Sequence, residues 1–114
     1  MDATQMILLY DYYGELLTKR QQECFDLRYN QDLSLGEIGQ ELGISRQGVY
    51  DNLSRTEALL QRMEEKTGCV RRDLQCRAAA TKIAELAKML SHNDTPAVAD
   101  LAEQILAAVE GLEE

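Results

Sequence analysis

A run of polar side chains that can recognise nucleic acid lies between positions 45 and 55. The carboxamides of Gln47 and Asn52 can pair with the edge of adenine, and the guanidinium of Arg46 can contact guanine or phosphate. Asp51 would repel the DNA backbone, and its best use is to accept a hydrogen bond from cytosine. The candidate nucleic-acid-binding residues are Ser45, Arg46, Gln47, Tyr50, Asp51, Asn52, Ser54 and Arg55. The alternative interpretation is a solvated polar face on a helix that only packs.

The pattern around these residues predicts a helix-turn-helix that would position them. Ser34 is an N-cap with Glu37 at the capping-box position, and Gly39 allows a close helix crossing. Gly43 stands at the turn, where a positive φ favours glycine. Ser45 caps a second helix, whose N-terminus could hold a phosphate. The inward residues of the two helices recur at helical spacing: Leu35, Ile38, Leu42, Val49, Leu53, Thr56 and Leu60. The opposite face of the second helix is then free to enter a major groove.

The remaining pattern is helical throughout, so the fold class is predicted to be all-α. The second helix of the motif should continue to Lys66, with Gly68 as its C-terminal stop, because Met63 extends a heptad-like stripe. Further helices are predicted over residues 4–16, 18–30, 70–91 and 96–112. We expect a helix-turn-helix domain over residues 1–68. A C-terminal helical extension, which serves dimerisation or packing, should occupy residues 69–114.

The last two predicted helices have wider apolar faces than a single hairpin can cover. Val98, Leu101, Ile105 and Val109 recur at helical spacing along the final helix. Packing against the long helix or against a second subunit would cover them. We therefore expect a homodimer.

The charge of the chain opposes the nucleic-acid hypothesis. The 114 residues include 12 Lys and Arg and 20 Asp and Glu, a net charge of −8. Residues 1–68 hold 7 basic and 12 acidic side chains, and residues 69–114 hold 5 and 8. Since most nucleic-acid affinity comes from neutralised phosphates, binding would require a local basic patch. A basic protein partner would be attracted instead.

Other functions find little support in the sequence. The three cysteines show no zinc-site spacing and the single histidine, His92, is remote, so no metal site is expected. The seven glycines form no phosphate-cradling loop and no nucleophile motif is present, so we expect neither a cofactor nor catalysis. No apolar run of membrane-spanning length and no secretion signal is found, which favours the cytoplasm.

Two stretches of the chain resemble known families. Residues 16–60, LLTKRQQECFDLRYNQDLSLGEIGQELGISRQGVYDNLSRTEALL, look like region 4 of a bacterial sigma factor. The segments LLYDYYGELLTKRQ and SRQGVYDNLSRTE more specifically resemble the YlxM family of small bacterial helix-turn-helix proteins. Members of that family are encoded beside the gene for the GTPase subunit of the signal recognition particle. The resemblance therefore implies a regulatory or accessory role in that pathway.

Two functions from different classes remain open. The first is a nucleic-acid-binding regulator that acts on DNA or on signal recognition particle RNA through Arg46, Gln47, Tyr50, Asn52 and Arg55. The second is a protein-interaction module that binds the particle's GTPase or its receptor. The helix-turn-helix favours the first and the acidic charge favours the second.

Overall fold

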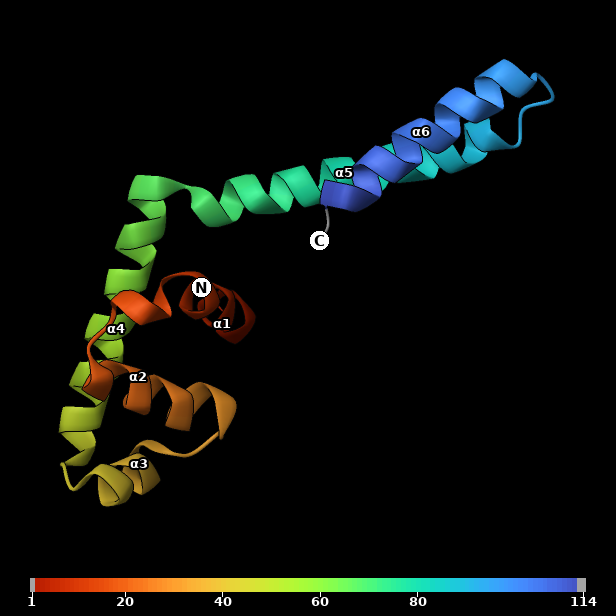
Figure 1. Ribbon diagram of the computed structural model, residues 1–114. Coiled ribbons are helices and arrows are strands. Elements are labelled where there is room, and N and C mark those ends of the chain that lie inside the picture. Colours follow the sequence, from red (N-terminus) through yellow and green to blue (C-terminus); the bar gives the residue numbers. More distant parts are fainter. Residues whose placement is uncertain (1, 113–114) are drawn as a thin grey trace. The chain divides into compact units, whose positions relative to one another are not determined.

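The computed structural model describes residues 2–112. The two predicted domains extend to positions 1 and 114, which lie outside the described residues. Within that range every regular element is helical, which confirms the all-α prediction (Figure 1). The α-helices are α1 (Ala3–Tyr13), α2 (Lys19–Phe25), α3 (Leu35–Leu42), α4 (Arg46–Thr67), α5 (Cys69–Ser91) and α6 (Pro96–Leu112). A 3-10 turn, Gly14–Leu16, follows α1, and a π-helical turn, Asp26–Asn30, follows α2. The chain forms two compact units that divide between Val70 and Arg71.

Three of the helices begin with the same reciprocal capping box. In α3 the Ser34 hydroxyl accepts from the Glu37 N–H at 3.1 Å, and the Ser34 N–H donates to the Glu37 carboxylate at 3.0 Å. The pair Thr18 and Gln21 does the same for α2. A third box at the start of α1 joins Asp2 to Gln5. Each box satisfies backbone donors that a helix start leaves without partners, so each fixes where its helix begins.

The first core cluster packs α1 and α2 against the C-terminal half of α4 (Figure 1). Phe25 lies at its centre and is fully buried. Its ring stacks on Tyr10, with the centroids 4.3 Å apart, and on Tyr29 at the same separation. The other buried members are Met6, Leu9, Tyr13, Leu17, Leu60 and Val70. Phe25 is the only phenylalanine of the chain, and sequence periodicity alone does not single it out.

The second core cluster holds α3 against the first half of α4. Its buried members are Cys24, Ile38, Val49 and Leu53. Leu35 and Leu42 pack at its edge. The inward stripe predicted for the two helices of the motif is therefore confirmed. Cys24 is fully buried and packs as a small core residue, and this burial raises the pKa of its thiol.

Specific hydrogen bonds hold the link from α2 to α3. The Leu33 N–H donates to the Leu27 carbonyl at 3.0 Å, and the Arg28 guanidinium donates to the Leu33 carbonyl at 3.0 Å. Asp32 adopts a left-handed conformation with φ 59°. These bonds fix the position at which the chain enters α3.

The C-terminal unit is a helical hairpin in which α6 runs antiparallel to α5 (Figure 1). The side chains buried within it are small: Ala80, Ala87, Ala102 and Val109. Large apolar side chains instead stay exposed, among them Leu86, Leu101 and Ile105. Val109 is therefore buried within the hairpin, although the sequence places it with Leu101 and Ile105 on a surface for a second subunit. In residues 2–112, no helix combines the length and the apolar character that crossing a bilayer requires.

Candidate nucleic-acid interface

The turn between α3 and α4 sets the position of the candidate residues. Gly43 ends α3 with φ 70°, a conformation that opposes any side chain. Gly39 permits a close approach, because a Cβ there would stand 2.7 Å from the carbonyl oxygen of Ile44. Ser45 then caps α4, and its hydroxyl accepts from the Gly48 N–H at 3.0 Å. The tight contact is thus between α3 and the backbone of the turn, and it fixes the direction in which α4 leaves.

The candidate residues lie on the solvent side of the first three turns of α4. Val49, Leu53 and Thr56 are buried against the core on the opposite side. The exposed candidates are Ser45, Arg46, Gln47, Tyr50, Asp51, Ser54 and Arg55. Asn52 is half-buried, and its side-chain oxygen accepts from the Thr56 hydroxyl at 3.5 Å. Seven of the eight candidates therefore share one accessible surface, and Asn52 lies at its margin.

Two of the candidates bind each other at the centre of this surface. The Gln47 carboxamide donates to the Asp51 carboxylate, with Nε2 3.1 Å from Oδ1. This bond leaves the Gln47 side-chain oxygen as an acceptor and one N–H as a donor. It also holds the carboxylate in place on the exposed face. Gln47 and Asp51 therefore present their polar groups to solvent as a hydrogen-bonded pair.

A shallow depression lies beside this pair, between the start of α3 and the start of α4. Leu35, Arg46, Gln47 and Tyr50 line it. Tyr50 is 55% exposed, which makes it the most exposed aromatic residue within residues 2–112. The guanidinium and the phenol offer hydrogen-bond donors beside an apolar floor. Such a surface can take a phosphate or a sugar edge as well as a peptide.

A basic stripe extends the surface along α4 beyond the candidate set. Arg55, Arg62 and Lys66 are all exposed and follow one another at intervals of seven and four residues. Residues at this spacing lie on one side of a helix. Sequence reasoning singled out Arg55 and used Lys66 only to mark the end of the helix. The signal that finds the stripe is the periodicity of the basic residues themselves.

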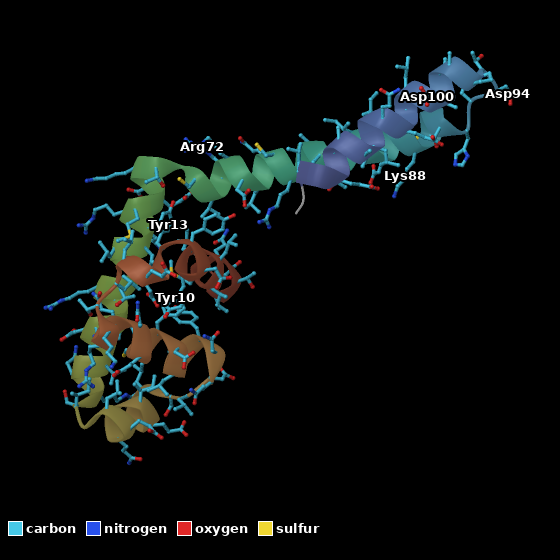
Figure 2. All side chains as sticks on the ribbon, in the orientation of Figure 1. Tyr10, Tyr13, Arg72, Lys88, Asp94 and Asp100 are labelled. Atoms are coloured by element: carbon cyan, nitrogen blue, oxygen red, sulfur yellow. The ribbon has the colours of Figure 1, made fainter. Side chains whose placement is uncertain are left out.

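Some of the negative charge of α4 is turned inward. The Tyr13 hydroxyl donates to the Glu64 carboxylate at 2.6 Å, and the same oxygen accepts from the Val70 N–H at 3.1 Å. The Tyr29 hydroxyl donates to the Glu57 carboxylate. Tyr13 comes from α1, as Figure 2 shows. Burial, and then the hydrogen bonds to Glu64 and Glu57, raise the pKa values of Tyr13 and Tyr29. These two carboxylates therefore tie α1 and the turn after α2 to α4.

Comparisons with known proteins agree with this architecture. A family model described as "UPF0122: Putative helix-turn-helix protein, YlxM / p13 like" matches residues 1–101. A UPF0122 protein of Acetivibrio thermocellus is 59% identical over 76 residues, which are 67% of this chain and 65% of that protein. A UPF0122 protein of Thermoanaerobacter sp. strain X514 is 43% identical over 112 residues, with 97% of this chain and 96% of that protein covered. One from Bacillus velezensis is 40% identical over 111 residues, with 97% and 93% covered.

Proposed function

Because the chain belongs to the UPF0122 family of YlxM/p13-like helix-turn-helix proteins, we propose that it is a nucleic-acid-binding regulatory protein. Its α4 lies in the major groove of duplex DNA in this proposal. One observation carries the proposal: the first turns of α4 bury Val49 and Leu53 and leave a polar face in solvent. A helix that only packed would not need this arrangement of guanidinium, carboxamide and hydroxyl groups.

The proposed contacts follow from the chemistry of each group. The N-terminus of α4 and the Ser45 backbone hold a phosphate, because the helix dipole and the N–H groups of the first turn attract anions. Arg46 contacts guanine or phosphate, and the pair of Gln47 and Asp51 faces base edges. Arg55 contacts a phosphate, and Arg62 and Lys66 continue the contact along the same strand. Tyr50 and Asn52 complete the surface from its two margins, and Ser54 lies between them, two turns after Gln47.

A second candidate function rests on charge. The net charge of −8 suits a basic protein better than it suits a duplex. The resemblance to the YlxM family associates such chains with the signal recognition particle, so its GTPase or the receptor of the particle is the partner in this alternative. The particle's RNA is the nucleic acid that the first proposal adds to DNA. Either function would be carried out in the cytoplasm.

A salt titration separates these ligands. The full chain is titrated against duplex DNA, signal recognition particle RNA and the purified GTPase at several salt concentrations. Nucleic-acid binding through several phosphate contacts predicts a steep linear fall of log K with log salt. Binding of the GTPase alone would overturn the nucleic-acid proposal.

A further inference from the structure

The contact between α5 and α6, which we call the seam, is formed by small side chains. It leaves the large apolar side chains of the hairpin exposed. Its buried residues are Ala80 and Ala87 on α5 and Ala102 and Val109 on α6. Small residues let two helices approach closely, and the larger side chains must then lie outside the seam. Three alanines and one valine bury little apolar surface, so the seam alone contributes little to the stability of the hairpin.

The large apolar side chains that lie outside the seam share one face of the hairpin. Each residue advances the side-chain direction by about 100° around an α-helix. On α5 the exposed residues Ile83, Leu86 and Leu90 therefore lie roughly 75° around the helix axis from the buried Ala80 and Ala87. On α6 the exposed residues Leu101, Ile105 and Leu112 lie at about the same angle, in the same rotational sense, from the buried Ala102 and Val109. Because the helices are antiparallel, equal rotation from a shared seam brings both stripes to one side. We call this surface the hairpin face, and its large members are Ile83, Leu86, Leu90, Leu101, Ile105 and Leu112.

The hairpin face carries no charged member along the length where the two helices overlap. The positions between its large residues are Ala79 and Ala108. Lys88 and Asp100, both labelled in Figure 2, lie on the other sides of their helices by the same helical geometry. A surface without charge cannot attract phosphate, so nucleic acid does not fit it. Its occupant must be apolar.

The size of the hairpin face matches what one partner of a stable dimer buries. Its six large residues are between 43% and 79% exposed. Together they offer on the order of 600 Å² of apolar surface, the upper end for a patch on a monomer and close to the roughly 800 Å² that each partner of a standard interface buries. Because the seam buries little apolar surface, the hairpin face must be covered whenever the chain is folded. A second copy of the same chain is the partner that is always present.

We propose that two copies of this chain pair through their hairpin faces and form a four-helix bundle related by a two-fold axis. The same residues contact their counterparts on both copies, so one substitution acts twice. The bundle buries the six large side chains that the isolated hairpin leaves in solvent. This pairing does not depend on the proposed function of α4, since it uses neither the candidate residues nor a ligand.

The test measures the mass of the full chain by sedimentation equilibrium without nucleic acid. The expected mass is twice 12.9 kDa at about 20 µM protein, with a melting temperature that rises with concentration. The substitutions Leu86→Glu and Ile105→Glu should each raise the dissociation constant at least about 100-fold. The matched controls, Thr81→Glu and Ala107→Glu, add the same charge to exposed positions on the other side of the same helices and should leave the dimer intact.

A second pair of variants separates lost association from lost helix. Leu86→Ala and Ile105→Ala remove apolar surface but keep or raise helix propensity, so helical circular dichroism should be retained while the dimer weakens about tenfold or more. A monomer mass for the unmodified chain across the concentration range would overturn the proposal. So would a dimer that survives all four substitutions on the hairpin face.

Discussion

The Gln47 carboxamide donates a hydrogen bond to the Asp51 carboxylate at 3.1 Å, in the middle of the exposed face of α4. The two residues are one helical turn apart, which is the spacing at which side chains on a helix meet. The bond places a fixed negative charge where the proposed interface would touch the nucleic acid. Both candidate functions use this surface, and they require opposite charges there.

Replacing Asp51 with lysine tests which charge the ligand requires. If the ligand is duplex DNA, Asp51→Lys should tighten non-specific binding roughly tenfold at about 0.1 M salt, since a repulsion is removed and an attraction added. If the ligand is a basic protein, the same change should weaken the complex. Fluorescence anisotropy measures both. Glu103→Lys is the matched control, because it makes the same change of charge at an exposed position of α6, which contributes nothing to the proposed interface. An equal effect of the two variants would show that only total charge matters.

The arginines at the two margins of the interface should each contribute about one phosphate contact. We expect Arg46→Ala and Arg55→Ala to weaken DNA binding and to reduce the slope of log K against log salt by about one unit each. Arg62→Ala tests the extension of the basic stripe by the same measurement. Lys88→Ala removes an exposed positive charge from the C-terminal unit and should leave the slope unchanged. A slope that none of the three arginine variants alters would remove α4 from the interface.

The left-handed conformation of Gly43 should make it sensitive to substitution. Gly43→Ala is expected to lower the free energy of unfolding by about 1 kcal/mol, because an alanine side chain opposes φ 70°. Gly36 is the control: it lies inside α3, and the nearest atom to an added Cβ is 4.0 Å away. Gly36→Ala should therefore leave stability unchanged or raise it. Urea unfolding measures both, and equal behaviour of the two variants would contradict the role given to the turn.

The aromatic stack around Phe25 should contribute more to stability than area alone. Phe25→Leu removes ring contacts with both Tyr10 and Tyr29, and we expect the free energy of unfolding to fall by about 1–2 kcal/mol. Tyr12→Leu changes an aromatic residue that is 37% exposed and should have a smaller effect. Thermal unfolding of both variants checks the prediction. A loss at Tyr12 as large as the loss at Phe25 would place the core elsewhere.

The capping box of α3 should make stability depend on acid pH. The Ser34 N–H donates to the Glu37 carboxylate and lowers the pKa of Glu37 below its ordinary 4.5. A lowered folded-state pKa stabilises the protein above the unfolded pKa, and this contribution is lost as the pH falls through the folded value. Acidification from about pH 6 should therefore lower the melting temperature more for the unmodified chain than for Glu37→Gln, which accepts the same bond without titrating. Identical acid dependence would contradict the role of the carboxylate.

The helix-turn-helix was predictable because its signals are local and periodic. Ser34, Gly43 and Ser45 have the caps and the turn that their residue types favour, and Ile38 and Val49 are buried as the spacing requires. Phe25 was not predictable, because its importance comes from α1 packing on it rather than from its own helix. The pairing of Gln47 with Asp51 follows from a four-residue spacing, but many such spacings are left unused on exposed helices.

The C-terminal hairpin shows what periodicity cannot decide. The spacing of apolar residues indicates which side of a helix is apolar, and both α5 and α6 are apolar over a wide arc. Whether alanines or leucines meet depends on how closely the backbones approach, which the sequence of one helix does not contain. In the structure Ala87 and Ala102 are buried between the two helices, and Leu86 and Leu101 remain exposed.

The arrangement of the tyrosines also determines the intrinsic fluorescence of the protein. The chain contains five tyrosines and no tryptophan, so its near-ultraviolet emission comes from tyrosine alone. Tyr13 and Tyr29 donate to carboxylates, and Tyr10 lies stacked on Phe25. Tyr50 stands in solvent on the candidate surface of α4. A molecule that covers this surface therefore changes the surroundings of an intrinsic fluorophore, and the protein carries its own optical reporter of occupancy.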